Sequence, residues 1–102
     1  MKKSLVKAIE NLGWIIHDNG EDLELEQSSP LGEDFIFYVS KKNAARDIAE
    51  YAANFDEEEH AEMWIEGRGT RGIPSSIRAL LDDAADIQTM LDDLAEAVQS
   101  VA

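Results

Sequence analysis

Residues 34–55, DFIFYVSKKNAARDIAEYAANF, decide the fold class, because their hydrophobic period changes halfway along the segment. The side chains alternate from Asp34 to Ser40, and Phe35, Phe37 and Val39 share one face, which is the pattern of a β-strand. From residue 44 onward, apolar side chains instead recur at the spacing of a helix that is buried along one side. A strand followed directly by such a helix indicates an α+β chain.

The second face of the same strand is also apolar, since it carries Ile36 and Tyr38. Strands that are apolar on both faces are typical of positions where both faces of the sheet are covered. We therefore expect this strand to lie at the centre of the sheet, or to be covered on both sides.

Two further strands are expected upstream. Trp14 to His17 forms the first, the turn residues Asp18 to Gly20 follow it, and the alternating segment Leu23 to Gln27 forms the second. A helix precedes both strands over Lys3 to Leu12, where the apolar residues have helical spacing, and Gly13 ends it. The three strands together predict a small antiparallel sheet.

Helical periodicity prevails from residue 44 to the end of the chain, with a Gly- and Arg-containing loop at Gly67 to Ile73. Asn43 is the expected N-cap of the first of these helices, and Asp56 that of the second. The buried residues of the second helix should be Ala61, Met63, Trp64 and Ile65. Pro74 and Ser75 open the last helical segment. This segment is either one long helix or a short helix and a long one, with the break at 82–84. The last segment has one apolar seam, made of Ile77, Leu80, Ala84, Ile87, Leu91, Leu94, Val98 and Val101.

The predicted architecture is therefore a single domain over residues 1–102. It has an N-terminal helix, a three-stranded antiparallel sheet, and three to four C-terminal helices that pack on the sheet.

Charge is the unusual property of this chain, which has 22 Asp and Glu against 9 Lys and Arg and a formal net charge of −13. Such a field repels nucleic acid and anionic membranes, and it speeds encounter with basic surfaces. We therefore expect a basic protein surface as the partner, which can belong to a nucleic-acid-binding protein, and no direct binding to nucleic acid or membrane. Cysteine is absent, and no apolar run is long enough to span a bilayer, so we expect a cytoplasmic protein.

The acids concentrate on the last two predicted helices. From Asp82 to Glu96 the helix rises by about 21 Å, with roughly one outward carboxylate per 4 Å. This spacing is near the ~3.4 Å between phosphates of one DNA strand, so a nucleic-acid mimic is one interpretation. The other is a solvated acidic face that keeps the protein soluble. The candidate contact residues are Asp82, Asp83, Asp86, Asp93, Glu96, Glu58, Glu59 and Glu62.

Motifs for catalysis or cofactors are weak. Gly67 to Gly72 matches G-x-G-x-x-G, but it follows a helix, whereas the dinucleotide fingerprint follows a strand. Glu57 and His60 have a metal-ligand spacing without the partner motifs that a bundle site needs. Arg68 and Arg71 either bind an anion or pair with the acidic helices. We expect no enzyme activity, no cofactor and no metal.

The apolar seam of the last helix supports an alternative function. Leu91, Leu94, Val98 and Val101 extend to the end of the chain, beyond what a small sheet is expected to cover. In this alternative the protein is a structural or assembly module, which forms a homodimer or binds a partner helix through the seam.

The segment Phe55 to Val98, with its pieces EEHAEMW, GIPS and LLDDA, and the upstream SPLGEDFIFYV at 29–39 resemble small acidic proteins carried by bacterial genomes and mobile elements. That group has no established activity. The resemblance implies an accessory role in phage or plasmid biology. In composition the chain is also similar to anti-restriction proteins and other DNA-mimic inhibitors.

Overall fold

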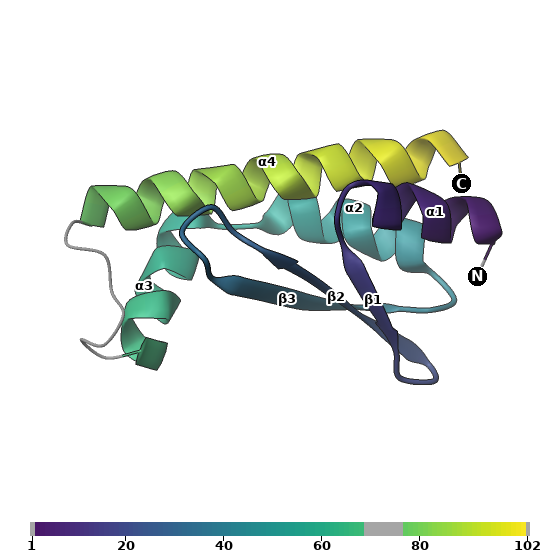
Figure 1. Ribbon diagram of the computed structural model, residues 1–102, viewed down its shortest axis with the longest axis horizontal. Coiled ribbons are helices and arrows are strands. Elements are labelled where there is room, and N and C mark those ends of the chain that lie inside the picture. The colour runs from purple at the N-terminus through teal and green to yellow at the C-terminus, as the bar shows by residue number, and fades with distance from the viewer. Residues whose placement is uncertain (1, 69–76, 102) are drawn as a thin grey trace.

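The computed structural model describes residues 2–68 and 77–101, and it confirms the α+β fold (Figure 1). A helix comes first, then a three-stranded antiparallel sheet, then the remaining helices. The elements are α1 (Lys3–Asn11), β1 (Ile15–Asp18), β2 (Asp22–Ser28), β3 (Asp34–Ser40), α2 (Ala44–Asn54), α3 (Glu57–Arg68) and α4 (Ile77–Val101).

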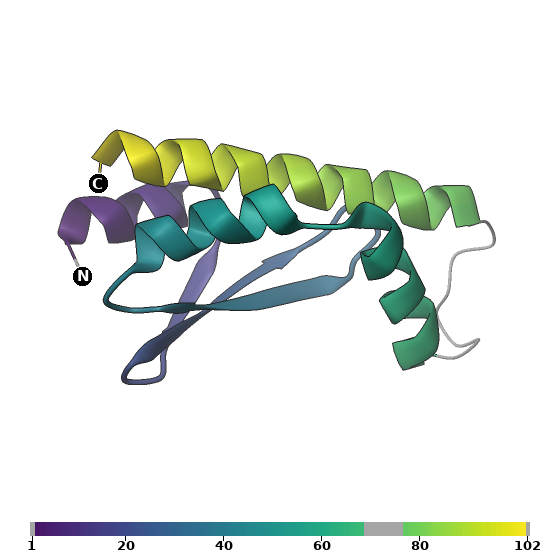
Figure 2. The ribbon, with the colours of Figure 1, turned by 180° about the vertical axis from the view of Figure 1, so that it is seen from behind.

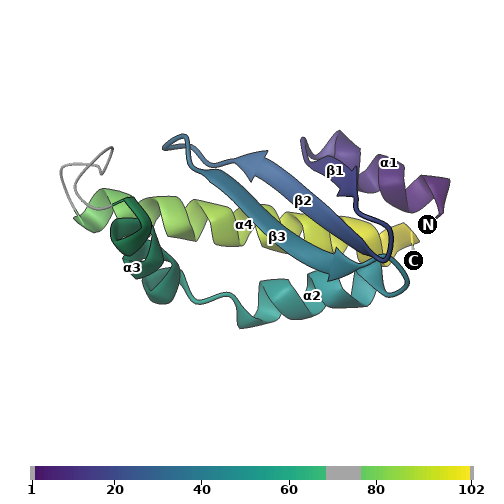
Figure 3. The ribbon, with the colours of Figure 1, turned by 90° about the horizontal axis from the view of Figure 1, so that it is seen from below.

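The helices α1, α4 and α2 cover one face of the sheet (Figures 1 and 2), and α4 contacts both other helices and lies between them (Figure 3). Seen from the other side, the sheet lies in front of these helices and nothing described covers it (Figure 3). The start of α1 and the end of α4 lie near each other at one end of this helical layer (Figure 2). The core between the layers consists mainly of Ile9, Trp14, Leu23, Leu25, Phe35, Phe37, Val39, Ile48, Ile87, Leu91, Leu94 and Val98.

The expected position of the most apolar strand is wrong. The strand order is β1-β2-β3, so β2 is central and β3 is an edge strand. The outward side chains of β3 are exposed, 40% for Ile36 and 62% for Tyr38. All helices that cover the sheet lie on its other face, so the second apolar face of β3 stays in contact with solvent. The acidic partners Glu26 and Glu24 stand opposite Ile36 and Tyr38 on β2, which makes this open face amphipathic.

The seam of α4 is buried as expected over most of its length. Leu80, Ala84, Ile87, Leu91, Leu94 and Val98 are each at most 2% exposed. The helix is continuous from Ile77 to Val101, so the break considered at 82–84 does not occur. Within α3, Ala61 and Trp64 are buried, but Met63 is 59% exposed, which corrects its expected place in the core.

The two helix starts that the sequence indicates differ in how they are built. Asp56 caps α3 as expected, since its Oδ1 accepts the backbone N–H of Glu59 at 3.0 Å. Asn43 occupies the N-cap position of α2, but its side chain makes no capping hydrogen bond. Its backbone N–H instead donates to Ser40 Oγ, which ties the start of α2 to the end of β3.

Among the described residues, no helix combines the length and the apolar composition needed to cross a bilayer.

Candidate binding groove beside strand β3

A groove of about 690 Å³ lies between the end of β3, the length of α2 and the first turns of α3. In Figure 3, α2 runs alongside β3, and α3 lies beyond the end where β3 begins. The lining residues are Asp22, Tyr38, Val39, Ser40, Asp47, Glu50, Tyr51, Asn54, Phe55, Asp56, Glu59, His60 and Met63.

Five carboxylates from separate parts of the chain meet in this groove. They are contributed by Asp22, Asp47, Glu50, Asp56 and Glu59, and none of the described residues that line the groove is Lys or Arg. Only Asp47 and Glu50 have a cationic neighbour among the described residues. That neighbour is Arg46, whose guanidinium lies 3.4 Å from Asp47 and 3.9 Å from Glu50. The groove is therefore strongly acidic, and it suits a cationic ligand.

Asp47 has a structural role within this acidic set. Its Oδ2 accepts the backbone N–H of Ser40 at 2.9 Å. This hydrogen bond, together with bonds to the Ser40 and Arg46 side chains, holds the pKa of Asp47 below its usual value. The carboxylate therefore stays ionised and fastens α2 to the end of β3.

Aromatic side chains form the apolar floor. Tyr51 stacks on the buried Phe37, and their ring centroids are 4.4 Å apart. The ring centroids of Phe55 and His60 are 5.3 Å apart. Partial burial raises the pKa of the Tyr51 hydroxyl above its usual value, so this group is neutral at physiological pH. The exposed Met63 adds a flexible apolar side chain.

His60 fixes α3 against the sheet. Its Nε2 lies 2.9 Å from Glu33 Oε2, and both side chains are mostly buried. The partner of His60 is thus Glu33, in the loop before β3, and not Glu57 of the E-x-x-H spacing. This contact sets the position of the α3 wall of the groove.

Seven of the eight acids proposed from the sequence are exposed, and they lie on α3 and α4. Asp82, Asp86, Asp93 and Glu96 lie on the side of α4 that faces away from its buried seam. Glu59 lines the groove beside β3, while Glu58 borders a separate polar depression that also includes Gln88 of α4. Glu62 is exposed on α3.

Asp83 is the exception, and its proposed role as a contact residue is wrong. The residue is 1% exposed, because it lies on the buried side of α4 and accepts the backbone N–H of Leu31. Its charge is therefore not offered to a partner. Of the four residues proposed for a seam-mediated dimer, Leu91, Leu94 and Val98 are fully buried within the chain, and Val101 is partly buried against the same core.

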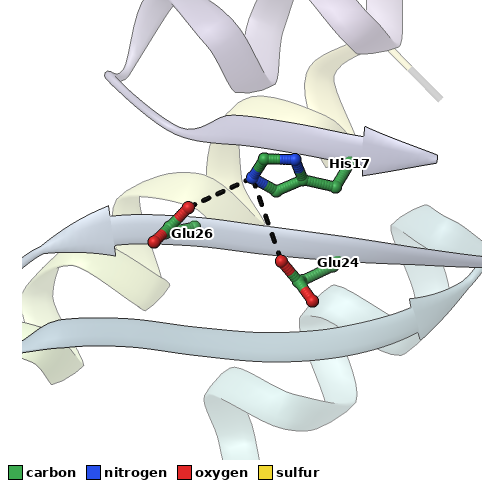
Figure 4. Close-up of side chains that lie close together, drawn as sticks. All are labelled: His17, Glu24 and Glu26. Carbon is green, nitrogen blue, oxygen red and sulfur yellow. Dashed lines mark hydrogen bonds and ion pairs between the residues drawn. The ribbon is translucent and has the colours of Figure 1, made fainter. Parts of the chain in front are cut away.

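A second cluster lies on the open face of the sheet, where His17 on β1 faces Glu24 and Glu26 on β2 (Figure 4). His17 Nε2 is 3.1 Å from Glu26 Oε1 and 3.8 Å from Glu24 Oε2. One ligand atom from each of the three residues lies within 4.8 Å of the others, so the cluster has the donors for a divalent cation. A contact between His17 and Glu26 on neighbouring strands explains the same geometry without a metal ion.

Arg71 lies outside the described residues, and so does the Arg68 side chain, so the anion site considered for this pair is not described by the structure.

The sequence signal for the groove was distributed over residues far apart in the chain. Asp22 and Glu50 have no distinguishing local pattern, Asp56 was expected only as a helix cap, and only their arrangement around β3 brings them together. Comparisons of the chain with protein-family models, with curated proteins and with solved structures found no match.

Proposed function

We propose that this chain is a non-enzymatic interaction protein that binds a basic segment of another protein in the acidic groove beside β3. The observation that carries the proposal is the lining of that groove, in which the described residues supply five carboxylates and a floor of aromatic rings but neither Lys nor Arg. A purely solvated acidic face does not require a concave, partly apolar surface. A cationic side chain has both an apolar stem and a charged head, and this groove accommodates both.

The net charge supports the same proposal. At −13, the long-range field of the protein accelerates encounter with a basic partner, and the groove then supplies the short-range contacts. Binding of this kind weakens as salt screens the charges.

The test compares two variants that each remove three negative charges. Asp22→Asn/Glu50→Gln/Glu59→Gln neutralises acids of the groove and leaves the structural Asp47 and the capping Asp56 in place. Asp82→Asn/Asp86→Asn/Asp93→Asn neutralises exposed acids on the outer side of α4, and it is the matched control because the net charge of the two variants is the same.

Each protein is immobilised and exposed to a lysate of the source cells, and bound proteins are eluted with a salt gradient and identified. We expect basic proteins that elute from the wild type and the α4 variant but are lost from the groove variant. At about 0.5 kcal/mol for each charge pair, loss of three pairs weakens binding roughly tenfold. Equal retention by both variants would contradict the groove as the binding surface.

Nucleic-acid mimicry is a second candidate function, and it uses the α4 surface. Asp82, Asp86, Asp93 and Glu96 are exposed, and none of the ion pairs between described residues involves them. The same two variants separate the candidates. Mimicry predicts that a nucleic-acid-binding protein is captured, that DNA competes with it, and that the α4 variant loses it.

A further inference from the structure

The free edge of β3 can be identified from the hydrogen bonds that flank the strand. Lys41 donates its backbone N–H to Glu21 at one end of the β2–β3 pairing, and Ser29 donates to Glu33 at the other. Hydrogen-bonded pairs alternate along an antiparallel ladder, so the odd-numbered residues of β3 bond to β2. The N–H and C=O groups of Asp34, Ile36 and Tyr38 therefore point away from the sheet.

Ser40 confirms this assignment. It is the next even-numbered residue, and its outward N–H donates to the Asp47 carboxylate and not to β2. None of the hydrogen bonds among residues 2–68 and 77–101 uses the outward N–H of Ile36 or Tyr38. These donors, with the neighbouring carbonyl groups, form an open row that an additional strand can pair with.

Apart from Asp34 and the Ser40 N–H that Asp47 occupies, the described β3 has few of the features that usually protect an edge strand. The strand has seven residues, its register with β2 is continuous, and it contains neither Pro nor Lys nor Arg. Its exposed side chains include Ile36 and Tyr38. Natural edge strands are usually kept short, charged, bulged or covered, because an unprotected edge pairs with other chains. The opposite edge strand, β1, is only four residues long.

We propose that the basic segment binds as an extended fourth strand along the free edge of β3. This inference rests on the proposed function, and it specifies how the partner is held. The main-chain groups of the segment would pair with Ile36 and Tyr38. Because side chains alternate along a strand, one set would lie beside Ile36 and Tyr38 on the open face, and the other would enter the groove near Glu50, Glu59 and Met63.

Charge selects a basic partner over a second copy of this chain. Two copies repel each other, since each has a net charge of −13. A second β3 would also bring Asp34 and no cationic side chain to the groove. A segment that alternates Lys or Arg with apolar residues matches both the carboxylates and the aromatic floor.

The probe is a synthetic decapeptide of alternating lysine and valine, added to the isotope-labelled full chain while amide hydrogen exchange is followed by NMR. We expect exchange of the Ile36 and Tyr38 amides to slow by at least about tenfold, while the Phe35 and Phe37 amides, already bonded to β2, change little. Two further peptides carry N-methyl groups on the valines only or on the lysines only. They have equal charge, and one of the two must lose binding if backbone pairing holds the peptide.

A pair of protein variants tests the same donor. Ile36→Pro and Ile36→Thr both replace the isoleucine side chain, but only the proline substitution also removes the outward N–H. An edge strand can accommodate a proline at a position whose N–H points away from the sheet. We expect Ile36→Thr to keep most of the peptide affinity and Ile36→Pro to lose at least about tenfold. If the proline variant does not fold, the exchange and N-methyl measurements on the wild type decide the question.

The outcomes separate the two proposals. If the groove variant Asp22→Asn/Glu50→Gln/Glu59→Gln weakens peptide binding while the Ile36 and Tyr38 amides stay unprotected, strand addition is overturned and the acidic groove stands. If the peptide binds the groove variant as tightly as the wild type, both fail. If protection appears with rising protein concentration and no peptide, the occupant is a second copy, and the basic strand is overturned.

Discussion

The carboxylate of Asp83 on α4 accepts the backbone N–H of Leu31 at 3.0 Å, although the two residues are 52 positions apart. Leu31 lies in the loop between β2 and β3, where Ser29 is buried and accepts the N–H of Glu33 through its hydroxyl group. This contact therefore holds the β2–β3 loop against α4. Asp83 stabilises the fold, while its exposed neighbours on α4 do not take part in such a contact.

Replacing Asp83 with Ala should destabilise the protein by about 1–3 kcal/mol, because the Leu31 N–H loses its acceptor in a partly buried place. The matched control is Asp82→Ala, which changes an exposed side chain and should alter the free energy of unfolding by less than about 0.5 kcal/mol. Urea unfolding followed by circular dichroism measures both. Equal effects of the two substitutions would show that the Asp83–Leu31 contact adds nothing.

The stability of the fold should rise with salt. With a net charge of −13 the folded chain repels itself, and screening relieves that repulsion. The melting temperature should therefore increase between about 10 mM and 150 mM sodium chloride, as the screening length falls from ~30 Å to ~8 Å. The increase should be smaller in each triple variant that lacks three charges. A melting temperature that does not change with salt would contradict the argument.

Asp47 should make the fold sensitive to acid. Its pKa in the folded protein is lowered, chiefly by the hydrogen bond from the Ser40 N–H. As the pH falls below the ordinary value of 3.8, the unfolded chain therefore takes up the proton first, and the stabilisation present at neutral pH is lost.

The comparison is with Asp47→Asn, which keeps an acceptor oxygen but does not titrate. The wild type should be the more stable protein at pH 6, and the difference should shrink as the pH falls through and below 3.8. Denaturant titrations at several pH values measure it. A difference that stays constant over this range would contradict the assigned role of Asp47.

The periodicity of the chain was enough to predict the elements and the fold class, because each element buries one face at its own period. The seam of α4 and the inward face of β3 are examples. The same periodicity wrongly predicted a central or doubly covered position for β3. The apolar side chains of Ile36 and Tyr38 are equally consistent with burial and with an exposed interaction surface. Only the position of the helices on the opposite face decides between these.

The candidate site was less predictable, since a groove depends on which distant residues the fold brings together. Glu59 was identified as a contact residue, but Asp22 and Glu50 were not, because nothing in their local sequence distinguishes them from other acids. Asp83 was misassigned because it lies at the edge of the apolar seam, where periodicity alone does not decide whether a side chain is buried. A shift of one residue turns a side chain by about 100° around a helix, so it moves from the outer surface toward the core.

The junction between α1 and β1 allows a final prediction. Gly13 has a φ of +92°, and a Cβ atom there would lie 2.5 Å from Gln27 Nε2. That amide donates to the Leu12 carbonyl at 2.8 Å, so Gln27 cannot move aside without losing the bond that ties the end of α1 to β2. Gly13→Ala should thus incur two costs, one from the backbone conformation and one from the displaced Gln27.

Gly20→Ala serves as the control, because Gly20 also has a positive φ, of +100°, but has open space around its Cβ position. Both substitutions should cost about 1–2 kcal/mol for the left-handed backbone, and Gly13→Ala should cost about 0.5–1.5 kcal/mol more for the lost hydrogen bond. Gln27→Ala should destabilise the wild type but should have little further effect in the Gly13→Ala background. Chemical denaturation of the four proteins in this cycle measures the coupling. Additive effects would mean that Gln27 makes room for the Cβ atom and keeps its bond to Leu12, which would contradict the second cost assigned to Gly13→Ala.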